Sequence, residues 1–187
     1  MNTTPQSAPA NGICIYGASR NNIDEAYKLA ARETGRLVAL AGRPLVSGGG
    51  RGGLMAAAIE GANAAGGTTI GVLPQFMVDK GWQHPELSQM IVAPDMHTRK
   101  RTMASLSSAA IALPGGIGTL EELLEIMTLR QLGLFKGRVV ILNTAGFYDG
   151  LVEFLHSVAA KGFMRYDMTG LFAVASTPQQ AVELASR

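Results

Sequence analysis

The sequence predicts an α/β fold in which a parallel sheet of about seven strands is covered by helices on both faces. Three observations lead to this prediction. Short apolar runs alternate along the chain with longer stretches of helical spacing. The short runs are continuously apolar, as parallel strands buried on both faces should be. Two glycine-rich loops each follow a predicted strand and open a predicted helix, which is typical of βαβ units.

Strands are predicted where a short apolar run is bounded by glycine, proline or small polar residues. The first run, 12–17, reads GICIYG and leads into the small-residue loop 18–20. The others have the same form and lie, in order, at 44–47, 68–73, 90–93, 109–113, 138–143 and 171–175. Helical stretches separate most of these runs, so right-handed crossovers and parallel pairing are expected.

Six helices are predicted between and after these strands. In 23–41 the apolar residues recur three and four positions apart, as on one face of a helix. The next stretch, 54–65, is rich in alanine, and the remaining helices are predicted at 95–107, 119–132, 147–161 and 178–186. The segment 75–88, which holds Trp82, is predicted to be irregular.

Composition limits the class of protein. The chain has 187 residues, and we expect a flexible N-terminal tail at 1–11 and one domain at 12–187. A net charge of +2 and 47% hydrophobic residues argue against nucleic-acid binding and against disorder. No apolar run or leader pattern indicates a membrane or secretion, so a cytoplasmic location is expected. A single cysteine, Cys14, and no ligand spacing predict neither a disulfide nor a metal site.

The first glycine loop, 48–53, fits the dinucleotide pattern GxGxxG. The full fingerprint needs an acidic residue roughly 20 positions later to hold the ribose. The segment 68–75 has no Asp or Glu, and the loop follows the second predicted strand rather than the first. An NAD-dependent oxidoreductase is therefore disfavoured. A tight turn and a cradle of backbone N–H groups for a phosphate or nucleoside remain as interpretations.

The second glycine loop, 114–119, is followed by the carboxylates Glu121 and Glu122. Helix N-termini attract anions, so two acidic residues beside a phosphate make sense if the ligand extends to a sugar or a glycosidic carbon. The alternative is structural. Thr119 and Glu122 have the spacing of a capping box, in which each side chain caps the first turn of a helix.

A basic segment, 96–101, places His97 and three cations at the start of a predicted helix. Helix starts disfavour cations, so this placement indicates an anionic partner. Arg99 suits a phosphate or a carboxylate because its guanidinium binds them in a bidentate manner. A solvated basic face is the structural alternative. His97 alone is more often a structural hydrogen-bonding residue than a catalyst.

Two long motifs make the sequence recognisable. Residues 114–122 read PGGxGTxxE, and residues 96–103 read MHxRKxxM. Together they resemble the motifs of the LOG (LONELY GUY) family, whose members are often labelled lysine decarboxylase-like. Further matches at 48–55, 128–133 and 146–148 extend the resemblance over nearly the whole chain. It implies a Rossmann-like three-layer α/β/α fold, usually in a homodimer. It also implies hydrolysis of the N-glycosidic bond of a cytokinin-type or adenine nucleoside 5′-monophosphate to free base and ribose 5-phosphate, with no cofactor.

The resemblance also implies site residues. The catalytic residues of the family match Arg99 and Glu122. The residues that match its substrate contacts are Gly115, Gly116, Gly118, Thr119, Glu121, Lys100, Thr128, Gly49 and Ser19. The chain departs from the family at Ser47, where tyrosine is frequent, and at Gly81, where a substrate-contacting glutamate is frequent. Loop 17–20 also only partly matches the usual Gly-Ser-Ser.

Chemistry assigns roles to the two matched catalytic residues. Cleavage of the N-glycosidic bond of a nucleotide develops oxocarbenium character on the ribose. A carboxylate such as Glu122 can stabilise this positive charge or can activate the attacking water. Arg99 can stabilise the departing base or hold the phosphate and sugar. A pyridoxal phosphate decarboxylase needs a Schiff-base lysine that no motif marks.

A carrier that binds a nucleotide or molybdenum cofactor without cleaving it is the competing interpretation, and such a carrier does not need the Arg99 and Glu122 pair. The preferred base is not determined by the sequence. Two interpretations remain for Trp82, Met55 and Met103: their side chains surround the prenyl tail of a cytokinin-type base, or they belong to the hydrophobic core.

Overall fold

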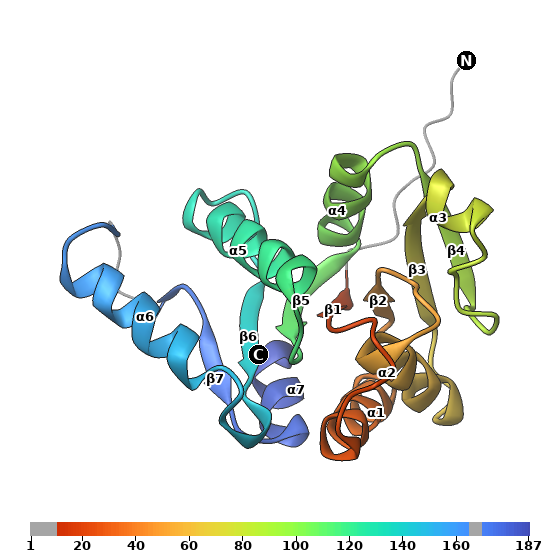
Figure 1. The fold of residues 1–187 in the computed structure, drawn as a ribbon, viewed down its shortest axis with the longest axis horizontal. Helices are drawn as coiled ribbons and strands as arrows, with labels where there is room; N and C mark the ends of the chain where they lie inside the picture. Colours follow the sequence, from red (N-terminus) through yellow and green to blue (C-terminus); the bar gives the residue numbers. More distant parts are fainter. Residues whose placement is uncertain (1–10, 165–169) are drawn as a thin grey trace.

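The computed structural model describes residues 11–164 and 170–187, and a seven-stranded parallel sheet forms its centre (Figure 1). The strand order is β4-β3-β2-β1-β5-β6-β7, and every neighbouring pair is parallel. The strands are β1 Gly12–Tyr16, β2 Leu45–Ser47, β3 Thr69–Pro74, β4 Gln89–Ala93, β5 Ser107–Ala112, β6 Arg138–Leu142 and β7 Ala173–Ala175. The predicted parallel α/β sheet is confirmed. Most of the predicted N-terminal tail, 1–10, lies outside the described residues.

Helices cover both faces of the sheet and complete the three-layer α/β/α arrangement. Figure 1 shows α1, α2 and α7 on one face and α4, α5 and α6 on the other. The helices are α1 Glu25–Leu40, α2 Gly53–Ala64, α3 Gln75–Asp79, α4 Met96–Ser105, α5 Ile117–Gln131, α6 Asp149–Ala160 and α7 Pro178–Ser186, with a 3₁₀ turn η1 at Thr144–Gly146. No helix of the described residues is both long and apolar enough to span a bilayer.

Strand β1 contributes side chains to both halves of the hydrophobic core. Ile13 and Ile15 belong to the cluster beneath α1, α2 and α7, whereas Cys14 and Tyr16 belong to the cluster beneath α4, α5 and α6. Successive residues of a strand point to opposite faces, and all five residues of β1 are buried. Burying each large aliphatic side chain contributes about 1.5–3 kcal/mol. The continuous apolar run in the sequence therefore reflects burial on two sides.

The strand order reverses beside β1. The chain moves outward from β1 through β2 and β3 to β4, and then crosses to the other side of β1 to form β5. In open α/β sheets, ligands bind beyond the carboxyl ends of the strands at such a reversal. Both glycine-rich loops lie there, because one follows β2 and the other follows β5.

Several element boundaries differ from the predictions. Segment 75–88 contains the five-residue helix α3, although it was expected to be irregular. The helix expected to end at 107 ends at Ser105, because Ser107 pairs with Gly12 and opens β5. The helix expected from Thr119 begins earlier, at Ile117. The last strand is only Ala173–Ala175, the part that pairs with β6. Pairing between distant segments decided these ends.

Candidate active site

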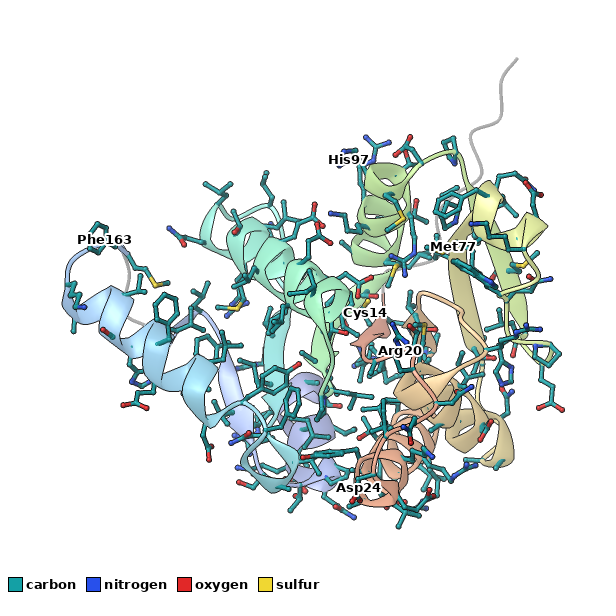
Figure 2. All side chains as sticks on the ribbon, viewed as in Figure 1. Cys14, Arg20, Asp24, Met77, His97 and Phe163 are labelled. Atoms are coloured by element: carbon teal, nitrogen blue, oxygen red, sulfur yellow. The ribbon has the colours of Figure 1, made fainter. Side chains whose placement is uncertain are left out.

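A cavity of about 870 Å³ opens at the carboxyl ends of the central strands. Its wall comes from the loops after β1, β2 and β5, from α4 and from the start of α5. The charged side chains that line it are Arg20, Arg51, Arg99, Glu121 and Glu122. Figure 2 shows Arg20 beside the central strands and Met77, another lining residue, which belongs to α3. The volume falls within the range of small-molecule sites.

An ion pair between two helices lies in the wall of this cavity. The Arg99 Nη1 atom of α4 donates to Glu122 Oε1 of α5 at 2.8 Å, and the two side chains are 7% and 12% exposed. The structure thus brings together the two residues that match the catalytic pair of the LOG family. A pair so shielded from water interacts more strongly than a surface pair, provided that its geometry is good.

The Arg99 guanidinium is held in place by the sheet as well as by Glu122. Its Nε donates to the backbone oxygen of Val72 in β3 at 3.0 Å. Its Nη2 lies against Gly48, where an added Cβ would approach within 2.0 Å of that nitrogen. Helix α4 is itself anchored, because the Asp95 side chain accepts the Thr98 amide at 2.7 Å. Gly48 therefore leaves the space that the guanidinium occupies.

The pKa of Glu122 is shifted by two opposing effects. Burial raises the pKa above its usual value, because desolvation disfavours the carboxylate. The nearby Arg99 cation lowers it, through its charge and its hydrogen bond, but burial has the larger effect. A carboxyl group with a raised pKa in a cavity is a candidate for exchanging a proton with a bound substrate or water.

The N-terminus of α5 forms an anion-binding edge beside this pair. Its N-cap is Gly116, which has no side chain to accept the first amides of the helix. Gly118 and Thr119, in the first turn, line the cavity. The amides of such a turn and the helix dipole attract phosphate. By contrast, the Asn21 side chain accepts the Gly53 amide at the start of α2.

The capping-box interpretation of Thr119 and Glu122 is wrong. Helix α5 starts at Ile117, so Thr119 is inside the first turn rather than at the cap. The Glu122 carboxylate bonds to Arg99 instead of reaching back to a Thr119 amide. The capping pattern and the ion pair both use Glu122, and only the tertiary contact with Arg99 shows which of the two roles the side chain has.

Lys100 and Glu121 form a second ion pair next to the first. The Lys100 Nζ contacts the Glu121 carboxylate and lies 3.0 Å from Glu125 Oε2. Glu121 lines the cavity, but Lys100 and Glu125 do not. Lys100 thereby acts on the site through Glu121, whose side chain is half exposed.

The other matched residues divide into two groups. Ser19, Gly116, Gly118 and Thr119 line the cavity with Glu121. Gly49, Gly115 and Thr128 do not. Gly49 lies in the first glycine loop and its amide donates to the Ser47 hydroxyl, Gly115 packs against Thr119, and the Thr128 hydroxyl donates to the Leu124 oxygen one turn back on α5.

The cavity also contains residues that the motifs did not indicate. Arg20 and Arg51 follow β1 and β2, so the rule that ligands bind beyond strand ends was the available signal. An apolar wall consists of Leu73, Met77, Trp82, Met96 and Met55. Of the residues for which cavity and core were both open, Trp82 and Met55 line the cavity. Met103 is fully buried and belongs to the core, and His97 lies at the outer end of α4, outside the cavity (Figure 2).

Comparisons with known proteins show the family to which the chain belongs. The family model described as "Possible lysine decarboxylase" matches residues 55–185. The cytokinin riboside 5′-monophosphate phosphoribohydrolase LOG of Oryza sativa subsp. japonica is 37% identical over 91% of this chain and 70% of its own length. The chain belongs to the LOG family. The LOG4 enzyme of Arabidopsis thaliana is 35% identical over 97% of this chain and 85% of its own length.

Solved structures with a similar fold include proteins named as carriers of a cofactor. The Moco carrier protein from Chlamydomonas reinhardtii is 28% identical, with a TM-score of 0.72 over 92% of this chain and 93% of that one. The molybdenum cofactor binding protein of Rippkaea orientalis has the same fold, with 24% identity and a TM-score of 0.71 over 93% and 94% of the two chains. Within residues 11–164 and 170–187, no three His, Cys, Asp or Glu side chains gather as metal ligands.

Proposed function

We propose that this protein hydrolyses the N-glycosidic bond of a nucleoside 5′-monophosphate, of the cytokinin or adenine type, and releases the free base and ribose 5-phosphate. The observation that carries the proposal is the buried Arg99–Glu122 pair in the wall of a cavity that also exposes the uncapped start of α5. Relatives named for this reaction share the LOG family with the chain.

The phosphate belongs at the α5 end of the cavity. The amides of Gly118 and Thr119 are in the first turn of a helix with no side-chain cap. Arg20 lines the same cavity and has no carboxylate within 4 Å among the described residues, so its charge is free to meet a dianion. Binding at the phosphate supplies interaction energy remote from the reacting bond, which positions the ribose.

Glu122 acts at the ribose. Hydrolysis breaks the bond between C1′ and the base nitrogen, the oxygen of a water molecule bonds to C1′, and one proton of that water ends on the base. The Glu122 carboxylate stabilises positive charge at C1′ or takes the proton from the water. Arg99 holds the carboxylate in place, and its positive charge lowers the pKa of Glu122 against the larger effect of burial, which raises it.

The test is turnover of AMP and isopentenyladenosine monophosphate, with base and ribose 5-phosphate measured by chromatography. Glu122→Gln preserves the volume and removes the charge, and it should lower kcat by about 10²- to 10⁴-fold. The matched control is Glu125→Gln, one turn along α5, which also removes a carboxylate but lies outside the cavity. Equal loss in both variants, or none in Glu122→Gln, would contradict the role of Glu122.

Arg99→Ala is a second, harsher variant. It should lower turnover by orders of magnitude, and it also leaves the buried Glu122 carboxyl without its partner. Removing one member of a buried pair costs about 3–5 kcal/mol of stability. The melting temperature is therefore measured with the rate, so that loss of fold is separated from loss of chemistry.

The carrier function has a specific observation in its favour, the fold shared with the Chlamydomonas protein at 28% identity. A carrier would bind the nucleotide and leave it intact. Nucleotide that raises the melting temperature without release of base would favour this function over hydrolysis. A lysine decarboxylase of the pyridoxal phosphate type is not supported, because no lysine is among the described residues that line the cavity.

The proposal includes a homodimer in the cytoplasm. Large apolar side chains are exposed on α5, α6 and the turn after α5, and such patches mark interaction surfaces. They are Leu124, Leu132, Leu134 and Phe154. Sedimentation analysis of the purified chain measures the oligomeric state, and fractionation of cells that express it measures the location.

A further inference from the structure

Trp82 places an aromatic ring at the cavity. The side chain lines the cavity and is 43% exposed, although tryptophan is largely buried in most proteins. The Lys80 Nζ lies 4.9 Å from the ring centroid and covers part of it. Lys80 does not line the cavity, whereas Trp82 does and keeps 43% of its surface exposed, so ring surface remains available on the cavity side.

The backbone around Trp82 is tied to the first glycine loop. The Trp82 oxygen accepts the Arg51 amide at 2.9 Å, and the Trp82 amide donates to the Met77 oxygen at 3.1 Å. Gly81 has a φ of +66°, the left-handed conformation that a glutamate at this position would adopt only at a cost. The ring is therefore carried by a fixed turn, and the turn replaces the glutamate that is frequent in the family.

Polar and apolar groups that line the cavity come from different elements. The α5 N-terminus and the loop with Arg20 contribute polar groups, whereas Leu73, Met77, Trp82 and Met96 contribute large side chains to the apolar wall, from β3, α3, the turn after α3 and α4. A nucleotide whose phosphate is at α5 and whose C1′ is at Glu122 has only its base left to reach this wall. Methionine side chains adapt to varied apolar shapes, so the wall tolerates a substituent on the base.

We propose that Trp82 is the specificity-determining residue for the base, and that its open ring face stacks on the heteroaromatic base of the nucleotide. This inference rests on the proposed function, because it takes the orientation of the nucleotide from that reaction. Recognition of the base in this chain then depends on stacking and apolar contact, because Gly81 has no side chain to contribute. Stacking on an aromatic side chain changes nucleotide affinity by about 10- to 100-fold.

The inference can be tested without turnover, because Trp82 is the only tryptophan of the chain. Its fluorescence is titrated with AMP, isopentenyladenosine monophosphate and ribose 5-phosphate in the Glu122→Gln variant. Both nucleotides should quench the emission, and ribose 5-phosphate, which has no base, should not. Equal responses to AMP and ribose 5-phosphate would overturn the inference.

Kinetics give the second readout. Trp82→Leu should raise KM for AMP by about 10- to 100-fold and change kcat little, and Trp82→Phe should restore most of the affinity because it keeps a ring. The matched control is Phe76→Leu. Phe76 is also exposed and near Lys80, at 5.9 Å from Nζ to its ring, but it does not line the cavity. An unchanged KM in Trp82→Leu would contradict stacking.

The two proposals fail in different ways. Hydrolysis of AMP without base-dependent quenching overturns the role of Trp82 and leaves the reaction intact. Base-dependent quenching without hydrolysis in the wild-type protein overturns the reaction and leaves Trp82 as the base-binding residue of a protein that holds nucleotides.

Discussion

Replacing Gly48 with alanine should displace the Arg99 guanidinium without removing it. The new Cβ would lie 2.0 Å from Arg99 Nη2 and 3.2 Å from the Met55 sulfur. Gly48 is not among the glycines with positive φ, so the backbone accepts alanine and the conflict is confined to these side chains. The substitution therefore perturbs the position of one group in the site.

The magnitude follows from the contact distances. Non-bonded heavy atoms pack at about 3.5 Å, so a nitrogen that starts 2.0 Å from the new Cβ must move by about 1.5 Å. A shift of that size breaks the bond of Arg99 to Glu122 at 2.8 Å or the bond to Val72 at 3.0 Å. Misplacement of a catalytic group by about 1 Å costs about 100-fold in rate. Overpacking costs about 1–3 kcal/mol of stability.

The assay is kcat/KM for AMP together with the melting temperature. Gly48→Ala should lose about 100-fold in kcat/KM while the protein remains folded. Gly150→Ala is the matched control, because its Cβ would meet no atom within 4 Å and it lies in α6, away from the cavity. Wild-type kcat/KM in Gly48→Ala would refute the idea that the fixed guanidinium position matters.

Two further predictions concern titratable groups. Burial raises the pKa of Glu122 and Arg99 lowers it, so kcat should fall as the pH drops through that pKa. Arg99→Ala should move this fall in kcat to higher pH, because the cation that lowers the pKa is gone. If single-turnover measurements show the fall at an unchanged pH, a group other than Glu122 causes it. Burial raises the pKa of the Cys14 thiol, the single cysteine of the chain, to about 12. Iodoacetamide should therefore label Cys14 after unfolding and not in the native protein. Rapid labelling of the native protein would contradict the burial of Cys14.

The local sequence pattern was sufficient to predict where the strands and most helices lie, but it did not predict where several of them begin and end. All seven strands and six helices lie near the predicted residues, because burial on both faces leaves a continuous apolar run. The short helix α3 was missed, since five residues carry too little periodicity. The end of α4 was misplaced because Ser107 pairs with Gly12, a contact across 95 positions that no local window contains.

The sequence by itself determined the parallel α/β class, the two glycine loops and the candidate residues Arg99 and Glu122. Only the tertiary structure decided that these two side chains meet, because they lie on different helices 23 residues apart. It also decided that Glu122 is an ion-pair partner and not a helix cap, since the spacing of Thr119 and Glu122 in the sequence is compatible with either role. The place of Trp82 depends on its hydrogen bond with Arg51 of the first glycine loop, and contacts between distant segments are visible only once the chain has folded.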